Sequence, residues 1–187
     1  MSRALRRAGG ESALLMIDIA AILDDLGADH VVIGAMAAAF HGVIRATTDA
    51  DLLLGVRASH LDALSKRLRA SGYQTELRRG DADDPIAAML VVTDAANNRV
   101  ELLSGIRGMD PLAFARAKHL DFHGRSLRFV SAEDFVAMKC HAGGPIDLED
   151  ARQIVWVVGS AFDHDLARRL ARRFGRSAAD ALERLRD

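Results

Sequence analysis

Hydrophobic and polar residues alternate along the chain with two different periods, and each period predicts a type of element. Apolar residues that recur every three or four positions predict helices, whereas short, β-branched apolar runs predict buried strands. The helical pattern occurs over residues 11–26, 35–41 and 61–68. The strand pattern occurs over residues 30–33, 51–54, 73–77, 87–92 and 100–103. This interleaving of strands and helices predicts an α+β domain.

A hairpin and a capped helix are predicted to follow these strands. Residues 120–130 contain two short runs around a turn at residues 123–125, which is typical of paired antiparallel strands. Ser131 then supplies an N-cap hydroxyl, and acidic residues up to Asp134 follow it. We therefore expect a helix to begin directly after the hairpin.

Helical spacing continues from Asp147 to the end of the chain, and another helix start is predicted at Asp110 and Pro111. Aspartate is a favoured N-cap, and proline is a favoured first helical residue. We therefore predict a core at residues 1–130 and a helical C-terminal subdomain at residues 131–187.

Composition narrows the classes of protein that fit this pattern. The chain has 187 residues, and 25 Lys and Arg against 26 Asp and Glu give a formal charge of −1. This balance predicts no general attraction to nucleic acid or to a membrane surface. The single cysteine, Cys140, excludes an internal disulfide, and no apolar stretch approaches the roughly 20 residues of a membrane span. We expect a cytoplasmic protein that does not cross a membrane.

A glycine turn and a pair of aspartates form the first candidate site. Gly34 and Ala35 join a predicted strand to a helix, where free backbone N–H groups hold phosphate oxygens. Asp49 and Asp51 are separated by one strand residue, so their side chains are expected to point to the same side. Two carboxylates in this arrangement suit a hard cation such as Mg²⁺. A turn cap for Asp49 and a solvent-exposed Asp51 are the structural alternatives.

The sequence VVIGAMAAAFHGVIRATTDADLLL, residues 31–54, resembles the signature of the DNA polymerase β nucleotidyltransferase superfamily. That signature has a strand, a glycine with a small residue, a spacer, and then D-x-D or D-x-E. Four further blocks resemble the minimal nucleotidyltransferases related to AbiEii-type toxins: residues 45–52, residues 100–105, Lys139 and residues 147–150. The resemblance implies a nucleotidyltransferase-like mixed β-sheet flanked by helices, with a C-terminal helical bundle.

The resemblance implies that Asp49 and Asp51 bind the catalytic Mg²⁺ or Mn²⁺. Glu101, on a neighbouring strand, matches the third carboxylate, which helps to bind the metal and accepts the proton of the attacking hydroxyl. Its structural alternative is an edge-strand glutamate that faces water. Glu101 also stands where aspartate is common, and its longer side chain loosens the near-octahedral geometry that Mg²⁺ prefers.

The resemblance also implies a substrate-binding set, which consists of Gly34, Ala35, Arg45, Lys139 and Asp147. Lys139 matches a lysine that contacts nucleotide phosphates, and Arg45 would neutralise phosphate charge. Their alternatives are a surface lysine beside a buried Cys140 and a salt bridge between Arg45 and the aspartate pair. Asp147 matches the acidic end of the lysine motif, but it is also a good N-cap for the following helix.

The sequence therefore predicts a metal-dependent nucleotidyltransferase that moves an NMP from an NTP to an acceptor hydroxyl. RNA, a protein and a small molecule are the candidate acceptors, and a toxin with an antitoxin partner is one implied role. A basic run in the tail would contact RNA or form a solvated helix face: Arg168, Arg169, Arg172, Arg173 and Arg176. Ala35, which lacks the usual serine hydroxyl, and Glu101 motivate the alternative of a catalytically degenerate nucleotide-binding or protein-interaction module.

Overall fold

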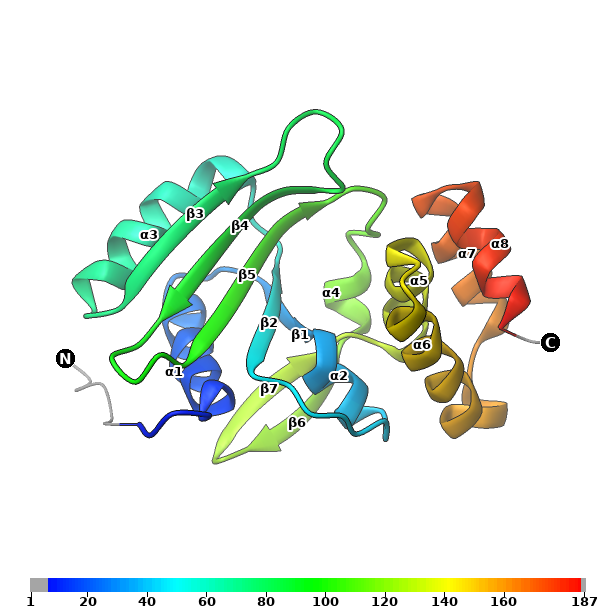
Figure 1. Cartoon of the computed structure of the whole chain (residues 1–187), viewed down its shortest axis with the longest axis horizontal. Helices are drawn as coiled ribbons and strands as arrows, with labels where there is room; N and C mark the ends of the chain where they lie inside the picture. The colour runs from blue at the N-terminus through cyan, green and yellow to red at the C-terminus, as the bar shows by residue number, and fades with distance from the viewer. Residues whose placement is uncertain (1–6, 186–187) are drawn as a thin grey trace.

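The computed structural model describes residues 7–185, and these residues form one seven-stranded mixed sheet (Figure 1). The strands are β1 (His30–Ile33), β2 (Asp49–Leu54), β3 (Gln74–Arg79), β4 (Ile86–Thr93), β5 (Arg99–Ile106), β6 (Lys118–Phe122) and β7 (Arg125–Phe129). Their order across the sheet is β3-β4-β5-β2-β1-β7-β6. The pairs β2–β5 and β1–β7 are parallel, and the other neighbouring pairs are antiparallel.

The described residues also form eight α-helices around this sheet. They are α1 (Ser12–Asp25), α2 (Gly34–Phe40), α3 (Leu61–Ala70), α4 (Ala113–Arg116), α5 (Ala132–Ala142), α6 (Pro145–Val158), α7 (His164–Phe174) and α8 (Arg176–Arg184). Two short 3₁₀ turns accompany them, η1 (Ala58–His60) and η2 (Gly159–Ala161).

Helices pack against the sheet in two groups. Helix α1 contacts β2, β5 and β7, and α3 contacts β3 and β4, so Figure 1 shows both behind the strands. Helix α5 contacts α6, α7 and α8, and these four form a bundle at one end of the sheet (Figure 1). The α+β class, the flanked mixed sheet and the C-terminal helical bundle are therefore confirmed.

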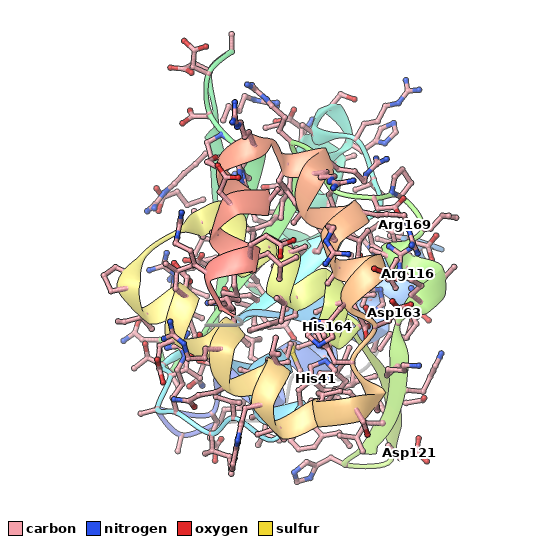
Figure 2. The ribbon with its side chains drawn as sticks, turned by 90° about the vertical axis from the view of Figure 1, so that its right-hand side faces the viewer. His41, Arg116, Asp121, Asp163, His164 and Arg169 are labelled. Atoms are coloured by element: carbon pink, nitrogen blue, oxygen red, sulfur yellow. The ribbon has the colours of Figure 1, made fainter. Side chains whose placement is uncertain are left out.

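An ion pair between a half-buried arginine and a buried aspartate joins α4 to the bundle. Arg116 donates Nε to Oδ2 of Asp134 at 2.8 Å and Nη2 to Oδ1 at 2.7 Å. The Asp134 carboxylate also accepts a hydrogen bond from the Ser131 hydroxyl, which caps α5 as the sequence predicts. Figure 2 views the molecule from the bundle side, with Arg116 labelled. This bidentate contact joins α4 to the first turn of α5.

One hydrophobic core extends from the sheet into the bundle. It includes Leu15 of α1, Leu52 of β2, Phe135 of α5 and Leu170 of α7. The division of the chain after residue 130 stays a prediction. Within residues 7–185, no helix combines the length and the apolar character that a membrane crossing requires.

The hairpin is confirmed, because β6 and β7 pair antiparallel around His123 and Gly124, which both have positive φ. Two helix starts were wrong. Helix α4 begins at Ala113, and the Asp110 carboxylate accepts a hydrogen bond from the backbone N–H of Leu112 in the preceding turn. Helix α6 begins two residues before Asp147, because a proline occupies its first position and needs no N–H partner there.

Candidate active site

The three predicted carboxylates come from two adjacent strands in the middle of the sheet. The parallel ladder between β2 and β5 sets Asp51 opposite Glu101 and Asp49 opposite Arg99. Ala50 is buried and the two aspartates are half-buried, so both point to the other face of the strand, as predicted. Strand β5 has neighbours on both sides, so the edge-strand alternative for Glu101 is wrong.

Gly34 directly follows β1 and begins α2 with a φ of +63°, a left-handed conformation that favours glycine. Ile33 pairs with Asp51 across β1 and β2, which brings the Asp51 carboxylate against the turn. A Cβ on Gly34 would overlap Asp51 Oδ2. Ala35 follows in the first turn of α2 with its side chain buried. The glycine therefore leaves the space that the Asp51 carboxylate occupies.

The pKa of Asp51 is raised to about 6, and burial is the main cause because it disfavours the charged form. The negative charges of Glu101 and then Asp49 raise it further, whereas Lys139 and Arg45 lower it. Asp51 is therefore neither solvent-exposed nor relieved of repulsion from its acidic neighbours. A bound cation would stabilise the ionised form of such a buried carboxylate by offsetting the negative charge of its neighbours.

The Glu101 carboxylate has a partner in the structure. Arg99, two residues earlier on the same strand, donates Nη2 to Glu101 Oε1 at 2.5 Å. Within the part of the chain that the structure describes, no three His, Cys, Asp or Glu side chains are arranged to hold a metal ion. The oxygen donors of Asp49 and Asp51 and their repulsion fit a hard cation. Glu101 fits by chemistry and register, but a guanidinium engages its carboxylate.

Lys139 belongs to a network of charges that links α5 with α6. Its Nζ lies 2.6 Å from Asp147 Oδ1 and 3.1 Å from Asp150 Oδ2. Arg45 Nε lies 3.3 Å from the same Asp150 oxygen, so the predicted alternative of a salt bridge to the aspartate pair is wrong. The Lys139 side chain is only 13% exposed, which rules out the alternative of a surface lysine. Cys140 beside it is buried, and burial raises the pKa of its thiol to about 12.

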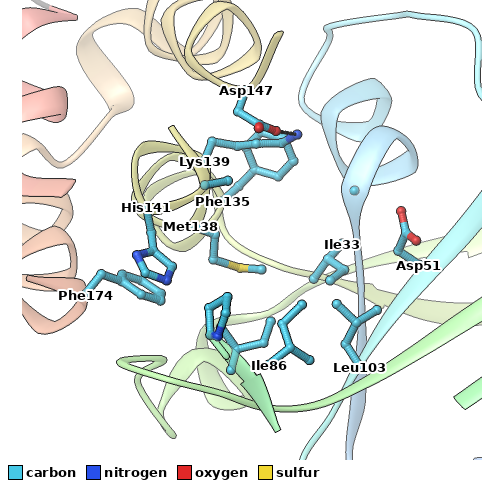
Figure 3. A pocket seen from close by; sticks show the side chains of 14 residues that line it. Ile33, Asp51, Ile86, Leu103, Phe135, Met138, Lys139, His141, Asp147 and Phe174 are labelled. Carbon is cyan, nitrogen blue, oxygen red and sulfur yellow. Dashed lines mark hydrogen bonds and ion pairs between the residues drawn. The ribbon is translucent and has the colours of Figure 1, made fainter. Parts of the chain in front are cut away.

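A cleft of about 400 Å³ lies between the sheet and α5 (Figure 3). It brings together four predicted site residues, which are Gly34, Asp51, Lys139 and Asp147. Apolar side chains from β1, β4, β5 and α5 cover most of the remaining wall: Ile33, Ile86, Leu103, Ile106, Phe135 and Met138. His141 and Phe174 stack at its far end with ring centroids 4.8 Å apart. The cleft is thus charged near Asp51 and Lys139 and apolar elsewhere.

Several predicted residues lie outside this cleft lining. Asp49 lies on the same strand as the cleft residue Asp51, and Glu101 is the cross-strand partner of Asp51. Arg45 is linked to the cleft by Asp150, which also contacts the cleft residue Lys139. Two of the five arginines in the basic tail, Arg168 and Arg173, have internal partners, whereas Arg169, Arg172 and Arg176 are exposed. Arg168 pairs with Asp165 and Glu183, and Arg173 donates to backbone carbonyls of the segment before α4. Arg169 lies on the exposed surface of α7 (Figure 2).

Neither a family model nor a curated protein matches this sequence. Solved structures do. The solution structure of the antibiotic-resistance factor ANT(2'')-Ia aligns with a TM-score of 0.63 at 16% identity, over 94% of this chain and 97% of that chain. An antigenic nucleotidyltransferase-like protein from Paracoccidioides brasiliensis aligns with a TM-score of 0.54 at 16% identity, over 93% and 92%. The chain has the nucleotidyltransferase fold.

A second structure of ANT(2'')-Ia, in complex with adenylyl-2''-tobramycin, also has this fold. It aligns with a TM-score of 0.58 at 16% identity, over 87% of this chain and 98% of that chain. The relation to AbiEii-type toxins stays a prediction from the sequence motifs.

Sequence reasoning missed Arg99 and the bridging position of Asp150. The spacing Arg99-x-Glu101 offers a signal, because residues two apart on a strand share a face. The position of Asp150 between Lys139 and Arg45 has no such signal, since it depends on how α6 lies beside α5 and the loop after α2.

Proposed function

We propose that the protein is a metal-dependent nucleotidyltransferase that moves an NMP from an NTP to a hydroxyl group of a small molecule. The observation that carries this proposal is the pairing of Asp51 with Glu101 in register, beside a cleft that also contains Lys139. Carboxylates and an ammonium group around one cavity are the groups that phosphoryl transfer requires.

Each residue has a proposed task in this reaction. Asp49 and Asp51 would hold Mg²⁺ or Mn²⁺, which when bound neutralises phosphate charge. Lys139 Nζ would donate to a phosphate oxygen, while Asp147 and Asp150 hold its position. Gly34 and Ala35 would offer backbone N–H groups, and Arg45 would add positive charge. The acceptor's hydroxyl oxygen would form a bond to the α-phosphorus while the bond to the pyrophosphate leaving group breaks. A Glu101 carboxylate oxygen would accept the proton of that hydroxyl.

A small molecule is the acceptor that the cleft favours. Its volume of about 400 Å³ and its mostly apolar wall suit a compact compound better than a polymer backbone. ANT(2'')-Ia was solved with an adenylyl derivative of tobramycin, so this fold accommodates such a product in that protein. RNA is less favoured, because Arg168 and Arg173 of the basic tail have internal partners. A protein acceptor, a toxin role and an antitoxin partner stay sequence-based predictions.

The test is transfer of an α-labelled NTP to a mixed panel of acceptors. The protein would be incubated with each labelled NTP and Mg²⁺ or Mn²⁺, with small hydroxyl compounds, tRNA and proteins in separate reactions. We expect label on a small molecule with wild type. Glu101→Gln should retain NTP binding and lose at least about 100-fold in transfer rate, since a general base contributes that much.

The matched control is Glu76→Gln. Glu76 on β3 lies in the same cross-strand row as Glu101, because both pair with Val91 of β4, but its side chain is exposed. This variant should transfer label at the wild-type rate. Label on tRNA would replace the proposed acceptor class, and NTP binding without any transfer would support the non-catalytic alternative.

A further inference from the structure

The β2–β5 ladder places a positive charge among the three carboxylates. Arg99 is the direct cross-strand partner of Asp49, and Glu101 is the direct partner of Asp51. Because Arg99 and Glu101 are two residues apart on one strand, their side chains share the face that carries both aspartates. Opposite charges directly across a ladder attract and like charges repel, so Arg99 is the stabilising member of this group of four.

Arg99 is held in this position by its backbone. Its N–H donates to the Ser12 hydroxyl at 3.1 Å, and that hydroxyl donates to the Thr48 carbonyl at 2.6 Å, just before β2 begins. Helix α1 thus fixes the start of both strands. The guanidinium is 35% exposed and donates Nη2 to Glu101 at 2.5 Å.

The Arg99 guanidinium is also incompletely satisfied. Its Nε is buried and has no hydrogen-bond partner among the described residues. A buried donor without a partner is unfavourable, so the side chain has less to lose by moving than a fully bonded arginine would. Arg99 therefore holds Glu101 through Nη2, whereas its Nε makes no hydrogen bond among the described residues.

We propose that Arg99 is an internal counter-ion that competes with the divalent cation for Glu101, so that metal binding requires Arg99 to release this carboxylate. This inference rests on the proposed function and takes Glu101 as a further metal ligand beside Asp49 and Asp51, as the family resemblance implies. Without metal, the guanidinium holds the Glu101 carboxylate, while Asp51 stays under the repulsion of its acidic neighbours. With metal, the cation would bind Glu101 together with the aspartates, and Arg99 would be free to move toward solvent. Arg99 is thus a positioning residue. It sets the metal concentration at which the Glu101 carboxylate joins Asp49 and Asp51 around the cation.

The test is direct binding of Mn²⁺ to the full chain, measured by the loss of the free-ion electron paramagnetic resonance signal without nucleotide. We expect Arg99→Gln to bind Mn²⁺ about tenfold more tightly than wild type, because an opposite charge at hydrogen-bond distance no longer competes. Arg99→Lys should lie between the two, since it keeps the charge and loses the planar donor group. Thermal unfolding of each variant verifies that it is folded.

The matched control is Arg78→Gln. Arg78 on β3 has an exposed side chain that donates to Glu76, and this contact is the main reason why the pKa of its guanidinium is raised, with a smaller contribution from the charge of Glu101. It should change Mn²⁺ affinity less than twofold. Combining Arg99→Gln with Glu101→Gln should abolish the tenfold gain, because the contested ligand is absent.

The results separate this inference from the proposed function. Equal Mn²⁺ affinity in wild type and Arg99→Gln, or an equal gain in Arg78→Gln, overturns the competition and leaves the metal site intact. A gain that survives in the Glu101→Gln background also overturns it. Absence of Mn²⁺ binding in every variant overturns both. Mn²⁺ binding by Arg99→Gln and not by wild type supports the inference, because Arg99 then excludes the metal from Glu101 completely.

Discussion

The carboxyl group of Asp51 lies between a glycine turn and two acidic neighbours, and its pKa is raised to about 6. The folded state therefore holds a proton more tightly than the unfolded chain, in which the pKa is near 3.8. The stabilising contribution is present below pH 4 and is lost as the pH rises through about 6. At pH 7.5 the ionised group lowers the unfolding free energy by up to roughly 3 kcal/mol.

We predict that Asp51→Asn stabilises the metal-free protein at pH 7.5 by about 1–3 kcal/mol, because a neutral amide needs no proton and repels no neighbour. The gain should be smaller at pH 5, where wild type is largely protonated. Urea unfolding at the two pH values measures both quantities. Asp121→Asn on the exposed face of β6 is the control and should change stability by less than about 0.5 kcal/mol (Figure 2). A loss of stability at pH 7.5 would contradict the argument.

Gly34 and Gly27 form a matched pair of glycines, with φ values of +63° and +62°. A Cβ on Gly27 would meet no atom within 4 Å, whereas one on Gly34 would overlap Asp51. Both alanine variants should lose about 1 kcal/mol from backbone strain. Gly34→Ala should lose about 1 kcal/mol more and should also weaken Mn²⁺ binding, because the Asp51 side chain must move. Urea unfolding and Mn²⁺ titration test this, and equal behaviour of the two variants would refute it.

At the scale of elements, the sequence predicts individual strands and helices better than it predicts which strands pair with each other. The hydrophobic period and turn residues suffice for β1, β2, the β6–β7 hairpin and the capped start of α5, because each depends on a few adjacent residues. The pairing of Asp51 with Glu101 joins strands about 50 residues apart. Without the family resemblance, no local signal identifies β5 as the partner of β2 or sets its register.

The same distinction explains the errors at Arg45 and Asp147. Spacing along the chain suggested that Arg45 pairs with the nearby aspartates, but α6 brings a buried aspartate within 3.3 Å of its guanidinium. Asp147 has the residue type of an N-cap, but the helix begins earlier at a proline, so its carboxylate is available to Lys139. Tertiary contacts outweighed local preference in both cases.

The charge network between α5 and α6 gives a prediction at this scale. Asp150 is 4% exposed and faces both Lys139 and Arg45. Asp150→Asn should lower the unfolding free energy by about 3 kcal/mol, because the buried Lys139 then keeps only Asp147 as an ion-pair partner and the half-buried Arg45 loses the carboxylate that it contacts. Asp147→Asn should lower it by only about 1 kcal/mol, since that side chain is 30% exposed. Chemical unfolding of both variants measures the difference, and equal losses would mean that burial does not decide it.

Across the whole molecule, the cleft depends on the placement of the helical bundle against the sheet. Its wall combines β1, β2 and β5 with α5 and with Phe174 at the end of α7. Residues from both sides of position 130 therefore build one cavity and share one core. Any change in the bundle's position alters the distance between Lys139 and Asp51, and with it the width of the cleft.

The buried thiol of Cys140 makes this coupling measurable as a chemical rate. It is the single cysteine of the chain, it is 3% exposed, and it neighbours Lys139 on α5. A disulfide reagent reacts only with an exposed thiolate, so labelling of the native protein requires α5 to open. We predict that labelling is slow and single-exponential, and that NTP with Mg²⁺ lowers its rate at least about tenfold. The absorbance of the thiol released from the reagent measures this rate. Unchanged labelling with a saturating nucleotide would show that ligand binding leaves α5 as free to open as before.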